Sequence, residues 1–76
     1  MPRERVQISH LKSFGDNVRR ERVLQQITQE RLAEMVALHP RTIQKIEAGK
    51  VNILLTTVIR FQRALRCPWE KLLGKP

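Results

Sequence analysis

The amino-acid sequence predicts an all-α fold of five helices in a single domain. Apolar residues recur every three or four positions in each long segment, and no segment alternates apolar and polar residues as a half-buried strand does. Thr, Pro and Gly also stand at positions where helices begin and end. With 76 residues, the chain has room for one domain and none for a separate ligand-sensing domain.

The first predicted helix follows a polar N-terminal segment. Residues 1–10 carry alternating charges and few apolar side chains, so we expect an arm or a weakly ordered lead-in there. After this segment, apolar residues recur at helical spacing: Leu11, Phe14 and Val18. We therefore expect one folded domain over residues 11–76, with a first helix that ends near Leu24.

Two short helices follow, joined by a tight connection. Thr28 is a good N-cap for the second helix, which ends near Val36. Its inward face consists of Leu32, Ala33 and Val36. Pro40 suits the first turn of a third helix because its missing N–H has no intrahelical partner there, and Gly49 suits the C-terminal stop. Ile43 and Ile46 give this helix an inward face, and the opposite side consists of Arg41, Gln44, Lys45 and Ala48.

Two more helices complete the predicted domain. The fourth covers roughly residues 54–65 and has an apolar stripe of Leu55, Val58, Phe61 and Leu65. Pro68 then opens a last turn or two in which three apolar residues share a face: Trp69, Leu72 and Leu73. These three are expected to close the core.

The second and third helices form a helix-turn-helix. Each is too short to be stable alone, and the connection of Ala37, Leu38 and His39 lets them pack against each other. Ala33 allows the third helix to approach closely, and Leu38 fills the turn.

Over about sixty residues, from Phe14-Gly15 to Leu73, the sequence resembles the phage-repressor and Cro-like (Xre-type) helix-turn-helix regulators. The matching residues are Val18-Arg19, Arg22, Thr28-Gln29-Glu30, Leu32-Ala33, Thr42-Ile43, Ile46-Glu47, Gly49, Asn52, Ala64-Leu65 and Leu72-Leu73. Several spaced features in one register make this resemblance specific. It implies a five-helix, lambda-repressor-like DNA-binding domain. The start of the third helix, together with the short length, also resembles restriction–modification controller proteins.

The resemblance implies that the third helix enters the major groove of double-stranded DNA while the second helix crosses the backbone. The positions that match base-reading residues are Pro40, Arg41, Gln44 and Lys45. Arg41 can pair with guanine, Gln44 with adenine, and Lys45 with guanine or phosphate. Pro40 stands where the family has a polar reader, so it offers only apolar contact.

Phosphate contacts are expected around the same face, because helix N-termini and the loop after the third helix favour anions. The residues that we assign to this role are Gln29, Thr28, His39, Thr42, Lys50 and Asn52. His39 has a second possible role, as a cap of the third helix. The resemblance also implies a partly buried salt bridge between Arg22 and Glu47, which explains an acid so near the DNA.

Besides Pro40, four further positions depart from the family pattern. Ala37 occupies a turn position that usually holds Gly, which costs about 1 kcal/mol. Ile53 and Leu54 leave the fourth helix without an N-cap. Gln62 lies within the apolar stripe, where a buried amide needs partners, so we expect it to face another chain.

A homodimer is expected, because a small domain gains stability when a second copy covers apolar surface. The candidate dimer interface consists of Trp69, Leu72, Leu73 and Gln62, with Val23 and Leu24 as a second apolar contact. Core packing is the alternative role for the last helix.

Charge and composition limit the classes of function that the protein can have. Fifteen Lys and Arg against seven Asp and Glu give a net charge of +8, which suits nucleic acid or anionic lipid. One Cys and two His provide no metal-ligand spacing, and we expect no metal, no cofactor and no enzymatic activity. The chain has no bilayer-spanning segment and no secretory leader, so we expect a cytoplasmic protein without a membrane partner.

The sequence therefore favours a dimeric transcriptional regulator, repressor or activator, that binds a palindromic DNA operator. The alternative is the antitoxin of a toxin–antitoxin pair, which binds DNA and a toxin protein. RNA polymerase is another possible protein partner. A third hypothesis is a helical module at a membrane surface that uses its charge without reading DNA.

Overall fold

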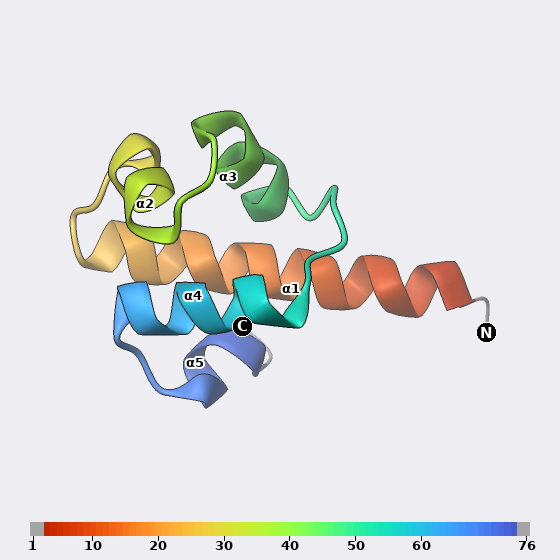
Figure 1. Cartoon of the computed structure of the whole chain (residues 1–76). Helices are drawn as coiled ribbons and strands as arrows, with labels where there is room; N and C mark the ends of the chain where they lie inside the picture. Colours follow the sequence, from red (N-terminus) through yellow and green to blue (C-terminus); the bar gives the residue numbers. More distant parts are fainter. Residues whose placement is uncertain (1–2, 75–76) are drawn as a thin grey trace.

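The computed structural model describes the backbone of residues 3–74 and the side chains of residues 9–74. Its helices are α1 (Arg3–Leu24), α2 (Gln29–Val36), α3 (Pro40–Glu47), α4 (Leu55–Leu65) and α5 (Trp69–Leu73). Figure 1 shows α1 as a long spine, with α2 and α3 on one side of it and α4 and α5 on the other. The predicted five-helix, all-α class is confirmed for this part of the chain. Within residues 3–74, no helix is both long and apolar enough to cross a membrane.

α1 begins earlier than the apolar spacing predicts. We expected an arm or weakly ordered lead-in over residues 1–10, but the helix already begins at Arg3 and runs to the predicted end at Leu24. Residues 3–10 contain neither Gly nor Pro. Once a helix exists, each added residue gains a backbone hydrogen bond for the dihedral angles that it fixes. The helix therefore extends toward the N-terminus despite few apolar residues.

The helix-turn-helix forms as its cap residues predict. Thr28 Oγ1 accepts a hydrogen bond of 3.0 Å from the Arg31 backbone N–H and so caps α2. Ala37 then adopts a left-handed conformation with φ of 57°, which reverses the chain although this region favours glycine. The Leu38 backbone N–H donates to the last turn of α2, at Ala33 O, over 2.9 Å. Pro40 is the first residue of α3.

The core lies between the two layers, against α1. Every helix contributes side chains to it, and its fully or nearly fully buried members are Phe14, Val18, Leu32, Ala33, Val36, Ile43, Ile46, Phe61, Leu65, Cys67 and Leu72. The rings of Phe14 and Phe61 meet edge to face, with centroids 5.9 Å apart, which joins α1 to α4. Leu38 packs against this core from the turn, as predicted.

The buried face of α4 is rotated about the helix axis relative to the apolar stripe that the sequence predicts. We expected Leu55 to be buried, but it is 73% exposed. The buried positions are Thr57, Phe61 and Leu65, each four residues after the last. At about 100° per residue, Leu55 lies roughly 100° from the mean direction of Phe61 and Leu65, so it falls outside the buried face. As predicted, Leu54 caps the helix without a side-chain hydrogen bond.

α5 buries only one of the three apolar residues predicted to close the core. Leu72 is fully buried, whereas Trp69 and Leu73 are 40% and 60% exposed. A helix of five residues has one narrow inward face, and Leu72 fills it. The assignment of Leu72 to a dimer interface is therefore wrong.

Gln62 also has a different role from the one that we expected. Its Nε2 donates to Cys67 O over 3.0 Å, within the chain, and so satisfies the amide where α4 turns into α5. This hydrogen bond removes the physical reason for placing Gln62 against a second copy.

Two polar residues of α1 clasp the C-terminal end of α5. The Asn17 amide, which is 1% exposed, donates to Leu72 O and Gly74 O, both over 2.7 Å. Arg20 donates from Nη1 to Asn17 Oδ1 over 2.9 Å and from Nη2 to Lys71 O over 2.7 Å. Because the last carbonyls of a helix lack intrahelical partners, these bonds anchor α5 to α1.

Candidate nucleic-acid interface

The outer face of α3 is polar and open. Arg41, Gln44 and Lys45 are exposed, while Ile43 and Ile46 bury the opposite face. None of the three exposed side chains makes a hydrogen bond or ion pair with another described residue. Their donors and acceptors are therefore available to a ligand. Pro40, the fourth predicted base reader, is half-buried at the start of the helix.

His39 caps the N-terminus of α3. Its Nδ1 accepts a hydrogen bond of 3.0 Å from the Arg41 backbone N–H, so its predicted capping role is confirmed. In this arrangement the neutral ring carries its proton on Nε2, which points away from the cap and can donate to an anion. His39, Arg41, Thr42 and Lys45 line a shallow hollow of about 390 Å³ at this end of α3.

A buried ionic network holds the other end of α3. Glu47 accepts hydrogen bonds from Arg22 Nε (2.7 Å) and Nη2 (3.1 Å), which confirms the predicted salt bridge. The exposed fractions of the two side chains are 13% for Arg22 and 4% for Glu47. Arg22 Nη1 also donates to Ile27 O over 2.8 Å, so a single guanidinium ties α1 to α3 and to the loop before α2.

Gln29 belongs to this network as well. Its Nε2 donates to Glu47 Oε1 over 3.0 Å and thereby links the start of α2 to the end of α3. We expected Gln29 only as a phosphate contact. Its second amide hydrogen still leaves that contact possible, as does the free hydroxyl hydrogen of Thr28, whose oxygen serves the cap.

Glycine allows the close contact between α1 and the end of α3. A Cβ built on Gly15 would lie 2.3 Å from Ile46 O and 2.8 Å from Glu47 O, distances that only a missing side chain permits. Gly49 has φ of 70° and lies against the backbone of Lys12. The C-terminal end of α3 therefore packs directly against the backbone of α1.

The same contact creates a polar cleft beside α3, with a volume of about 560 Å³. Its lining residues are Lys12, Asp16, Arg19, Arg22, Gln29, Gln44, Glu47 and Ala48. Two exposed basic side chains of α1, Lys12 and Arg19, thus lie next to a predicted base reader and were missed at the sequence level. They are seven residues apart, two helical turns, on either side of Gly15, and this spacing is the signal that places them on one face.

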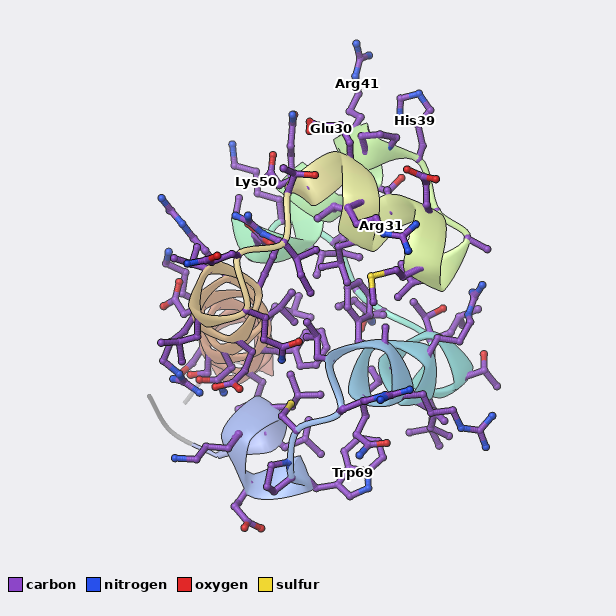
Figure 2. All side chains as sticks on the ribbon, turned by 90° about the vertical axis from the view of Figure 1, so that its left-hand side faces the viewer. Glu30, Arg31, His39, Arg41, Lys50 and Trp69 are labelled. Atoms are coloured by element: carbon purple, nitrogen blue, oxygen red, sulfur yellow. The ribbon has the colours of Figure 1, made fainter. Side chains whose placement is uncertain are left out.

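The loop after α3 adds polar groups to this side of the molecule. Figure 2 shows Arg41, His39 and Lys50 directed to the same side, together with Glu30 from the first turn of α2. Lys50 and Asn52 are exposed, and Asn52 Oδ1 accepts a hydrogen bond of 3.0 Å from the Ile53 backbone N–H. The predicted base and phosphate contacts are therefore grouped around α3.

Comparison with known proteins agrees with this geometry. A family model described as helix-turn-helix matches residues 18–72. The control protein C.SmaI of Serratia marcescens is 38% identical over 62 residues, which cover 82% of this chain and 74% of that protein. The crystal structure of the restriction–modification controller protein C.AhdI from Aeromonas hydrophila superposes with a TM-score of 0.78 at 26% identity, over 84% of this chain and 97% of that one. The chain therefore belongs to the Xre/Cro-like helix-turn-helix family of DNA-binding regulators and is related to the restriction–modification controller proteins.

Proposed function

We propose that this protein controls transcription of a restriction–modification system by binding a palindromic operator as a homodimer. The observation that carries the proposal is the outer face of α3. There Arg41, Gln44 and Lys45 are exposed on a helix that His39 caps and that Arg22 and Gln29 hold at Glu47. The kinship with two controller proteins supports a regulator of this type in preference to an antitoxin.

In the proposed complex, α3 lies in the major groove with its N-terminal half at the base edges. Arg41 has the geometry for two parallel hydrogen bonds to guanine O6 and N7, and Gln44 for adenine N6 and N7. Lys45 contacts guanine or a phosphate. Pro40 contributes an apolar contact, which suits a thymine methyl group.

Phosphate contacts surround this reading face. The proposed residues are Gln29, Thr28, His39, Thr42, Lys50 and Asn52, and we add Lys12 and Arg19 because they line the cleft beside α3. These contacts set the register on the duplex and carry no sequence information. Their number implies affinity that falls steeply with salt, because each neutralised phosphate releases counterions.

The proposed dimer contact uses apolar side chains that the fold leaves uncovered. Trp69 and Leu73 on α5 are exposed, as are Leu54 and Leu55 at the start of α4. Figure 2 shows Trp69 at the opposite end of the view from Arg41 and His39, so a partner seated on it leaves α3 free. A second copy would cover this apolar area, and binding to a palindromic operator requires that the two copies of α3 lie on one side of the dimer, about 34 Å apart.

Selection of bound duplexes from a random pool tests the proposal. We expect a palindrome whose half-sites are about one helical turn apart and whose affinity exceeds that of random DNA by about 10³-fold or more. The proposal is wrong if no sequence is enriched, or if affinity is insensitive to salt between about 50 and 200 mM.

Two substitutions distinguish residues that contact bases from residues that contact only the phosphate backbone. Arg41→Ala should cost about 1–3 kcal/mol on the selected site and relax preference at one base pair in each half-site. Lys50→Ala should weaken all duplexes alike and lower the salt slope by about 1. Lys50 is a better position than Gln29 for testing a phosphate contact, because the Gln29 amide also donates to Glu47, and its removal would disturb the fold. If both variants lose the same affinity for every DNA sequence, Arg41 does not read a base.

A further inference from the structure

A second basic surface lies between α2 and α4, apart from α3. It is a shallow hollow of about 430 Å³ lined by Met35, Arg60, Arg63, Ala64 and Arg66, which we call the arginine flank. Three of its five residues are arginine. The DNA contacts proposed above use none of them.

One arginine of the flank is committed to the fold and two are not. Arg60 donates from Nη1 to Val36 O over 2.9 Å and from Nη2 to Thr57 Oγ1 over 3.2 Å, so it fastens α4 to the end of α2. Arg63 and Arg66 are exposed and form no hydrogen bond through their side chains and no ion pair with any described residue. The flank thus presents two guanidinium groups without hydrogen bonds or ion pairs among the described residues, beside one that holds α4 to the end of α2.

Arg66 also occupies a costly backbone position. It ends α4 with φ of 52°, in the left-handed region that favours glycine. The strain is local, because the Arg66 N–H still donates to Gln62 O over 2.9 Å. Position 66 therefore carries an exposed charged side chain, although glycine would adopt this backbone conformation with less strain.

Apolar side chains lie beside these charges. Met35 is 39% exposed within the flank. The Gln25 amide donates to Leu65 O over 2.6 Å and so joins the ends of α1 and α4, which Figure 1 shows side by side. Val23 and Leu24, just before Gln25, are 56% and 70% exposed. This end of the molecule combines positive charge with uncovered apolar surface.

Positive charge beside exposed apolar side chains favours one kind of binding partner for the arginine flank over the others. A phosphodiester backbone would use the guanidinium groups but would leave Met35, Val23 and Leu24 without a partner. A second copy placed symmetrically on the same surface would bring like charges together, because a two-fold interface is self-complementary. A protein segment with carboxylates around an apolar side chain satisfies both features, since arginine pairs with carboxylates through parallel hydrogen bonds.

We propose that the arginine flank docks an acidic, amphipathic segment of a different protein. The carboxylates of this segment pair with Arg63 and Arg66, and its apolar side chain covers Met35. In Figure 2, Arg41 and His39 lie at the top of the view while α4 lies well below them, so the flank stays open when α3 contacts DNA. The regulator can then hold DNA and a protein partner at the same time.

The test uses the full chain and a fluorescein-labelled helical peptide that carries two leucines one turn apart, flanked by glutamates. We expect saturable binding that is lost when glutamine replaces every glutamate, or alanine both leucines. The affinity of the double variant Arg63→Gln/Arg66→Gly for the peptide should be about one tenth of the wild-type affinity or lower, because two charge-assisted contacts are removed. Arg66→Gly alone should keep or raise the Tm, since glycine relieves the left-handed backbone.

A matched control removes two charges elsewhere. Lys12→Gln/Lys50→Gln should retain peptide affinity and weaken duplex binding, whereas Arg63→Gln/Arg66→Gly should do the reverse. The proposal is overturned if both double variants lose peptide binding equally, since net charge alone would then explain it. It is also overturned if the flank variant binds the peptide like the wild type, or weakens duplex binding as much as the control. In that last case the flank is a DNA contact.

Discussion

Removal of the negative charge at Glu47 should destabilise the whole domain. Its carboxylate accepts three hydrogen bonds, from Arg22 Nε, Arg22 Nη2 and Gln29 Nε2, at 2.7, 3.1 and 3.0 Å. With only 4% of its side chain exposed, little water is available to replace them. Glu47→Gln leaves the Arg22 charge buried without a counter-ion, and breaking a buried pair typically costs about 3–5 kcal/mol.

This cost is large for a chain of this size. At roughly 0.05–0.15 kcal/mol per residue, a domain of 76 residues has about 4–11 kcal/mol of stability in all. The single variant should therefore be marginally folded, which makes the change easy to measure. Urea unfolding followed by far-UV circular dichroism gives the free energy of unfolding if the slope with denaturant is unchanged.

A double-mutant cycle isolates the ion pair. Arg22→Met replaces the guanidinium with an apolar side chain, and the double variant Arg22→Met/Glu47→Gln should be less destabilised than the sum of the two single variants, by about 2–3 kcal/mol. The matched control is the exposed pair Arg31–Glu34, with an N–O distance of 3.8 Å and side chains 64% and 71% exposed. Its coupling should be about 0.2–0.5 kcal/mol and should fade with salt.

The reasoning fails if the Arg22–Glu47 coupling is no larger than that of the control pair. It also fails if about 0.5 M salt weakens the coupling of the buried pair as strongly as that of the exposed one, since buried pairs are screened much less.

Three further outcomes follow from particular contacts. Gly15→Ala should lower the free energy of unfolding by about 1–3 kcal/mol, because its Cβ would meet Ile46 O at 2.3 Å; unchanged or increased stability in urea titrations would contradict the close contact. Leu72→Ala should cost about 2–5 kcal/mol and Leu73→Ala less than about 0.5, and similar Tm losses for both would place both in the core. Burial raises the pKa of the Cys67 thiol, with a further contribution from the negative charge of Glu21. The thiol therefore ionises more readily in the unfolded chain, so its stabilising contribution is complete below its ordinary pKa and is lost as the pH rises through the raised one. Thermal melts at alkaline pH should show this loss in the wild type and not in Cys67→Ala.

Most of the scaffold could be predicted because its signals are local. Thr28 marks a helix start through its side-chain oxygen, and Pro40 and Gly49 mark helix ends through their backbone conformations. The inward residues of α2 and α3 follow from helical spacing alone. The site residues on α3 follow in turn, because the face opposite Ile43 and Ile46 must point outward.

The errors occur where burial depends on a distant segment. We included Leu55 in the stripe of α4 because it is apolar, and we left out Thr57 because it is polar. Thr57 is nevertheless buried, because α4 packs against α1 and α2. Trp69 and Leu73 are apolar in the same way as Leu72, but no element of the described chain covers them. The clasp by Asn17 is a contact across 55 residues with backbone carbonyls, which carry no sequence signal.

The position of α3 in space is fixed by α1 as well as by α2. With eight residues each, α2 and α3 are too short to persist without tertiary support. α1 provides that support through the ion pair to Glu47 and the close contact at Gly15, and it also holds α5 through Asn17 and Arg20. Helix α3 and the apolar side chains of α5 are thus both attached to α1. If α5 contacts a second copy as proposed, the distance between the two copies of α3, and with it the half-site spacing of the operator, depends on α1 as well as on the dimer contact.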